Sequence, residues 1–128
     1  MPSNTVIDAS AVLALLNDEP GAAAVEARLA AGILSTVNLA EVISVLADNG
    51  VPDAEIRFAI SALGLVSVAF DVEMAHLAGA LRPKTKAFGL SLGDRACLAL
   101  ALHSSFSVLT ADRSWKDLDL GIEVELIR

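Results

Sequence analysis

The stretch VIDASAVLALL, residues 6–16, passes from a short apolar run into a longer helical pattern, and an aspartate, Asp8, stands at the junction. The run TVID at 5–8 has the composition of a strand, and ASAVLALLN at 9–17 has the apolar spacing of a helix. This stretch therefore predicts a strand followed by a helix, with a carboxylate at the carboxyl end of the strand.

The same alternation is repeated along the chain. Further strands are predicted at 33–36, 65–70, 107–110 and 122–126, and further helices at 21–32, 38–50, 53–64, 72–81 and 93–104. Strands that alternate with helices indicate βαβ units and a mainly parallel sheet of about five strands, covered by helices on both faces. The last strand, with alternating Glu123 and Glu125, is expected at an edge. Since no repeat, low-complexity tract or linker divides the chain, residues 1–128 are predicted to form one α/β domain.

The composition limits the class of protein. Hydrophobic residues make up 55% of the chain and charged residues 20%, which is typical of a compact globule. The single cysteine, Cys97, excludes a disulfide framework and a cysteine metal site. The first residues lack the pattern of a signal peptide, and no charge-free apolar stretch reaches the roughly 18 residues of a membrane span. We therefore expect a cytoplasmic protein that does not associate with membranes.

The positive charges are gathered in one part of an acidic chain. The net charge is −7, yet six of the nine basic residues lie between positions 82 and 116, where only two acids oppose them. They are Arg82, Lys84, Lys86, Arg95, Arg113 and Lys116. Such a segment is typical of a surface that binds backbone phosphates, although a solvated basic loop has the same composition.

Four acids stand where a strand or loop leads into a helix. Asp8 ends the first strand, and the other three lie in STVNLAEV, GLSLGDRA and VLTADRSW as Glu41, Asp94 and Asp112. In an open parallel sheet such positions meet at the carboxyl ends of the strands, where ligands bind beside a switch in strand order. Each acid has a plainer interpretation, because Ser91 with Asp94 and Asn38 with Glu41 have the spacing of a capping box, and Asp8 and Asp112 have the position of N-caps.

Taken together, the four acids favour a metal site. Carboxylates a few ångströms apart repel one another unless a cation lies among them. Oxygen ligands suit Mg²⁺ or Mn²⁺ and do not suit zinc, for which the chain offers only the separated His76 and His103. A carboxylate-held metal pair is a known means of hydrolysing phosphodiesters.

In these motifs the chain resembles the PIN-domain ribonucleases, and most closely the VapC-type toxins of bacterial toxin–antitoxin modules. VIDASAVLALL, NLAEV, LSLGDRACLALA and VLTADRSW carry the resemblance in order, over nearly the whole chain. It implies a three-layer α/β/α sandwich and a Mg²⁺- or Mn²⁺-dependent endoribonuclease that acts on RNA, often transfer RNA. It also implies a homodimer and a small cognate antitoxin that lies over the active site.

The resemblance assigns roles to individual residues. It implies that Asp8, Glu41, Asp94 and Asp112 surround the metal, with Asp8 and Asp94 as the most direct ligands, and that Ser10 and Thr110 support the site. RNA binding is expected from the basic segment, through Arg82, Lys84, Lys86, Arg95 and Arg113.

Three alternatives stay open from the sequence. Asp8 is also the nucleophile expected of a phosphotransfer domain, although Ser10 stands where that chemistry commonly has a second acid. A noncatalytic interaction domain would use the same carboxylates only as helix caps. The helices between 36 and 63 are very apolar, which suits either a partner surface or an ordinary core.

Overall fold

The computed structural model describes residues 4–128 and contains one sheet of five strands. The strands are β1 (Thr5–Ile7), β2 (Gly32–Ser35), β3 (Val66–Val68), β4 (Ser107–Thr110) and β5 (Val124–Leu126). All neighbouring pairs are parallel, in the order β3-β2-β1-β4-β5. Val6 in the central strand lies beside Ile33 on one side and Val108 on the other. The predicted α/β class is confirmed, and β5 is an edge strand as expected.

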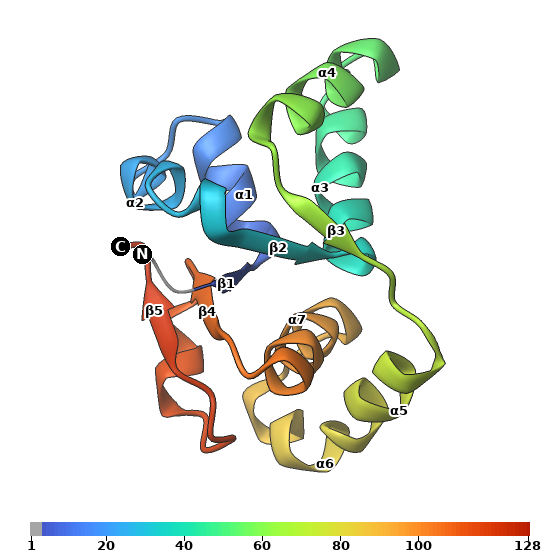
Figure 1. Cartoon of the computed structure of the whole chain (residues 1–128), viewed down its shortest axis with the longest axis vertical. Coiled ribbons are helices and arrows are strands. Elements are labelled where there is room, and N and C mark those ends of the chain that lie inside the picture. The colour runs from blue at the N-terminus through green and yellow to red at the C-terminus, as the bar shows by residue number, and fades with distance from the viewer. Residues whose placement is uncertain (1–3) are drawn as a thin grey trace.

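Helices cover both faces of this sheet. The α-helices are α1 (Ala9–Leu16), α2 (Ala22–Glu26), α3 (Thr36–Asp48), α4 (Asp53–Leu63), α5 (Val72–Ala80), α6 (Arg82–Thr85) and α7 (Leu92–Ser104). Three 3-10 helices join them: η1 (Leu29–Ala31), η2 (Lys86–Phe88) and η3 (Arg113–Asp117). Figure 1 shows α1 to α4 on one side of the sheet and α5 to α7 on the other, which confirms the three-layer sandwich.

The central strands divide their side chains between two cores. Val6 and Val108 pack with α5 and α7, whereas Ile7 and Leu109 pack with α1 and α3. Successive strand residues point to opposite faces, so a strand buried on both faces must be apolar at every position. This explains why the predicted strands are continuous apolar runs.

The largest differences from the prediction lie in two parts of the chain. The helix expected at 21–32 is divided into α2 and η1, and Gly32 is the first residue of β2. A Cβ at Gly32 would lie 2.6 Å from the terminal methyl carbons of both Ile7 and Leu65, so a larger residue at the start of this strand would force these side chains to move. Residues 82–88, for which no element was predicted, form α6 and η2.

The strand order fixes where a ligand can bind. From β1 the chain moves to β2 on one side, whereas β4 lies on the other side of β1. In open parallel sheets ligands bind in the crevice at such a change of direction, which here lies at the carboxyl ends of β1 and β4, and we call this region the crevice. Asp8 directly follows β1, and Thr110 is the last residue of β4. In the described part of the chain, no helix is long and apolar enough to cross a membrane.

Candidate active site

Asp8 lies at the centre of the crevice, buried at 4% exposure. Two hydroxyl groups donate hydrogen bonds to the same carboxylate oxygen, Oδ2: Ser10 Oγ at 2.6 Å and Thr110 Oγ1 at 2.9 Å. The hydroxyls are themselves held by the backbone, since the amides of Ala111 and Asp112 donate to Ser10 Oγ and Thr110 Oγ1. Ser10 and Thr110 thus fix the rotamer of Asp8, and Oδ1 receives no hydrogen bond from the described residues.

The surroundings of Asp8 oppose its ionisation. Burial is the largest cause, and with the negative charges of Asp94 and Glu41 it raises the pKa of Asp8 from 3.8 to about 6. The two hydroxyl hydrogen bonds lower the pKa but do not offset the burial. Asp94 and Glu41 are therefore close enough to act on Asp8, as the sequence predicted.

Glu41 comes to the crevice from the first turns of α3. Its Oε1 accepts a hydrogen bond from Asn38 Nδ2 at 2.8 Å, and its carboxylate lies against Gly93, where a Cβ would overlap with it. The capping box expected from Asn38 and Glu41 is wrong, because α3 begins two residues earlier. Ser35 is the N-cap, and its Oγ accepts from the amide of Val37.

Asp94 occupies the first turn of α7, and here the capping box is confirmed. The Asp94 amide donates to Ser91 Oγ at 3.1 Å, and the Ser91 amide donates to Asp94 Oδ2 at 2.9 Å. Capping does not exclude a second role, because the bond to Ser91 engages one oxygen of a half-buried carboxylate.

Asp112 lies at the rim of the crevice. It is exposed, and its Oδ1 accepts from the amide and the hydroxyl of Ser114 at the start of η3. Its charge does not contribute to the pKa of Asp8, unlike those of Asp94 and Glu41. The structure therefore brings three of the four predicted acids together and places the fourth beside them.

The predicted cations fall into two groups. Arg82, Lys84 and Lys86 are exposed on α6 and η2, and none of them forms an ion pair with the described residues. Arg95 and Arg113 are engaged instead: Arg95 donates to the carbonyl of Ala78 on α5 at 3.0 Å.

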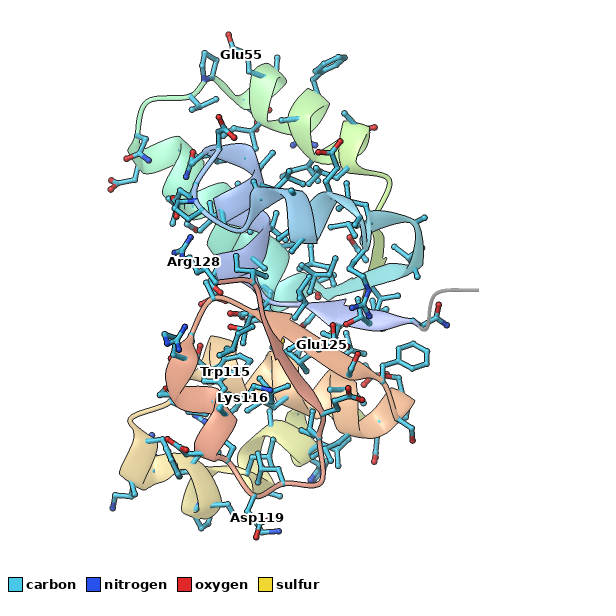
Figure 2. The ribbon with its side chains drawn as sticks, turned by 90° about the vertical axis from the view of Figure 1, so that its left-hand side faces the viewer. Glu55, Trp115, Lys116, Asp119, Glu125 and Arg128 are labelled. Atoms are coloured by element: carbon cyan, nitrogen blue, oxygen red, sulfur yellow. The ribbon has the colours of Figure 1, made fainter. Side chains whose placement is uncertain are left out.

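Arg113 donates to the carbonyl of Arg128, and Arg128 in turn reaches Glu19 and the carbonyl of Pro20. Figure 2 labels Arg128 near the end of β5, apart from Lys116 on η3, which donates to the carbonyl of Val124. Arg128 therefore adds a cation near the ends of the strands that sequence reasoning did not single out.

The PIN domain family model matches residues 5–120 of the chain. The chain belongs to the PIN domain family.

Three solved structures have the same fold as this PIN domain. A chain of the DNA-bound VapBC structure from Salmonella typhimurium superposes with a TM-score of 0.77 at 16% identity, covering 99% of this chain and 100% of that one.

A chain of a toxin–antitoxin complex from Klebsiella pneumoniae gives a TM-score of 0.73 at 18% identity, with 98% of each chain covered. A chain of the DNA-bound VapBC2 structure from Rickettsia felis gives 0.74 at 15% identity, covering 95% of this PIN domain and 97% of that chain. No curated protein sequence matches. The resemblance to a PIN domain is confirmed, and the three solved structures share its fold.

The donor chemistry of the PIN crevice suits a hard divalent cation. Three carboxylates approach one another, and none of Asp8, Glu41 and Asp94 forms an ion pair with a described residue. Among the described residues, however, no group of three or more Asp, Glu, His or Cys side chains is already arranged around a metal position. Each carboxylate is turned toward its own donor: Ser10 and Thr110 for Asp8, Asn38 for Glu41, and the Ser91 amide for Asp94.

We predict that Asp8→Asn stabilises the metal-free protein at neutral pH. The folded-state pKa of about 6 exceeds the ordinary value of 3.8, so the protonated carboxyl stabilises the fold below about pH 4, and this contribution is lost as the pH rises through 6. A pKa difference of about two units corresponds to roughly 3 kcal/mol of unfolding free energy. We therefore expect the free energy of unfolding of Asp8→Asn to exceed that of the wild type by about 1 to 3 kcal/mol at pH 7.5 and to equal it at pH 4. Urea unfolding with a chelator measures it.

Asp48→Asn, at an exposed position on α3, is the matched control and should change stability by less than about 0.5 kcal/mol. An Asp8→Asn variant that is less stable than the wild type at pH 7.5 would contradict the conclusion that burial and neighbouring charges make the ionised Asp8 destabilising.

Proposed function

We propose that this PIN domain is the toxin of a toxin–antitoxin module and acts as a Mg²⁺- or Mn²⁺-dependent endoribonuclease. The observation that carries the proposal is the meeting of Asp8, Glu41 and Asp94, from three separate elements, at the switch point of the sheet. Membership of the PIN family and the likeness to VapBC chains support a toxin nuclease role. We further propose a homodimer, and structured RNA such as tRNA as the substrate.

The residues of the crevice have separate tasks in this proposal. Asp8 and Asp94 hold the metal most directly, with Glu41 and Asp112 around them, and the bound metal supplies an activated water and offsets the charge of the phosphate. Ser10 and Thr110 keep Asp8 in one rotamer, which leaves its Oδ1 available. The capping box holds Asp94 at the start of α7, so that its carboxylate stays on the crevice side.

The nuclease proposal predicts metal-dependent cleavage that needs Asp94. Purified protein should cleave a total small-RNA pool with Mg²⁺ or Mn²⁺ and not with chelator. Asp94→Ala should reduce cleavage at least about 100-fold, because a metal contributes several kcal/mol to the stability of the transition state. Mg²⁺ should also raise the melting temperature of the wild type and not that of Asp94→Ala.

Glu55→Ala is the control, since Glu55 is exposed on α4, where Figure 2 shows it at the far tip of the molecule. Equal cleavage by wild type and Asp94→Ala would contradict the proposal. Wild-type protein that neither cleaves RNA nor is stabilised by Mg²⁺ would favour the noncatalytic domain, whose carboxylates only cap helices.

The exposed cations of α6 and η2 are proposed to hold the RNA backbone. Arg82, Lys84 and Lys86 lie within five residues of one another and have no acidic partner among the described residues. Each phosphate contact on single-stranded RNA releases about 0.7 of a counterion. Replacing all three by Gln should therefore lower the slope of log K against log salt by up to about 2, measured by fluorescence anisotropy with a labelled RNA and the Asp94→Ala protein.

Arg57→Gln is the matched control, because Arg57 is an exposed arginine already paired with Asp53 on α4. A slope that stays the same in the triple variant would assign RNA binding to another surface.

The antitoxin is proposed to bind the groove between α3 and α4. This groove has a volume of about 330 Å³ and is lined mainly by Leu39, Ile43, Ile56 and Ile60. Ile43 is 36% exposed and Val45, on the same helix, 38%, so apolar surface is left uncovered. The structural neighbours solved as toxin–antitoxin complexes support an antitoxin as the occupant.

We predict that Ile43→Glu weakens antitoxin binding while metal-dependent cleavage stays within about twofold of the wild type, since a charge placed in an apolar groove has to be desolvated on binding. Pull-down with the small protein encoded beside the gene measures the first effect. Val72→Ser removes an apolar side chain that is 75% exposed at the start of α5, and it should leave binding unchanged. Full binding by Ile43→Glu would move the antitoxin to another face.

A further inference from the structure

Asn38 is a fully buried polar residue on α3, one turn before Glu41. Its Nδ2 donates two hydrogen bonds, to Glu41 Oε1 at 2.8 Å and to the carbonyl of Gly93 at 3.0 Å. One amide group therefore joins the first turns of α3 to the first turn of α7. These two turns carry Glu41 and Asp94, which are separate in sequence but act on the same Asp8.

The contacts around Glu41 define its position. A glutamate has three side-chain torsions, so its carboxylate is not fixed by the helix that carries it. Here Asn38, on the same helix, donates a hydrogen bond to the Glu41 carboxylate. The carboxylate also packs against Gly93 of α7, where a side chain would overlap with it. The Asn amide nitrogen has two N–H donors, so one atom bonds both the Glu41 carboxylate and the Gly93 carbonyl.

The remaining atom of this amide argues against a purely structural role. Asn38 Oδ1 is buried and accepts no hydrogen bond from the described residues. Buried acceptors without partners are rare in proteins, because leaving one unpaired destabilises the fold. An apolar residue would avoid that cost, but it would leave the Glu41 carboxylate and the Gly93 carbonyl without this donor. The two bonds that the amide makes therefore point to a task in the crevice.

We propose that Asn38 is a positioning residue, which holds the Glu41 carboxylate in the crevice beside Asp8 and Asp94 and thereby raises the affinity of the site for a divalent cation. This inference rests on the proposed metal-dependent function. Hydrogen-bond partners of metal-ligating carboxylates commonly contribute 10- to 100-fold in affinity or activity.

The first test is Mn²⁺ binding by calorimetry, which needs no substrate. Asn38→Ala should weaken Mn²⁺ binding by about tenfold or more and reduce kcat with little change in KM. Asn49→Ala is the matched control, because Asn49 is an exposed asparagine at the end of the same helix and should bind Mn²⁺ like the wild type. Equal affinity in Asn38→Ala and wild type would overturn the inference, whereas wild-type protein that binds no Mn²⁺ would overturn the proposed function itself.

A double-mutant cycle separates positioning from general packing. If Asn38 acts through Glu41, then in a Glu41→Ala protein the further change Asn38→Ala should leave Mn²⁺ affinity within about twofold. A tenfold loss in both backgrounds would overturn the positioning role. Should Asn38→Ala fail to fold, the wild type supplies the test: the side-chain amide NMR signals of Asn38 should shift when Mg²⁺ is added. Signals that stay in place while Mg²⁺ binds would overturn the inference.

Discussion

The burial of one carboxylate, that of Asp8, is the constraint on which the rest of the site depends. The central strand β1 ends between β2 and β4, so the residue that follows it cannot reach bulk water. An ionised group in such a place needs hydrogen bonds or a counter-charge. Two hydroxyls supply the hydrogen bonds, but the pKa stays raised because Glu41 and Asp94 add negative charge. The fold thus maintains an unbalanced negative charge at its switch point.

Asp94 combines a capping role with a position near Asp8. Asp94 belongs to a complete capping box with Ser91, and this bond holds its backbone and carboxylate at the helix start. A helix N-terminus also favours negative charge, through its free amides and dipole. A crowded carboxylate at a helix N-terminus therefore destabilises the fold less than the same carboxylate on a strand would. The capping role of Asp94 is therefore compatible with its proposed role as a metal ligand.

Much of the fold could be predicted because it depends on local patterns. The apolar runs of β1 and β4 are continuous because both faces are buried, and the position of Asp8 follows from the end of the first run. The role of Asn38 could not be predicted, because its second partner, Gly93, lies 55 residues away. The spacing of Asn38 and Glu41 indicated a cap, but Ser35 starts the helix. The glycine before Asp94 was the available signal, since it leaves room for the Glu41 carboxylate.

The distribution of charge is compatible with the proposed RNA substrate, although the chain is acidic. The acids of the crevice would repel RNA unless a divalent cation offset them, so metal and substrate binding depend on each other. The cations differ in whether they bond groups within the protein. Arg95, although adjacent to Asp94, donates to the Ala78 carbonyl and fastens α7 to α5. The exposed cations of α6 and η2 are not used in this way. The phosphates that flank the cleaved one would therefore be bound outside the crevice, and the carboxylates inside it would be left to the metal.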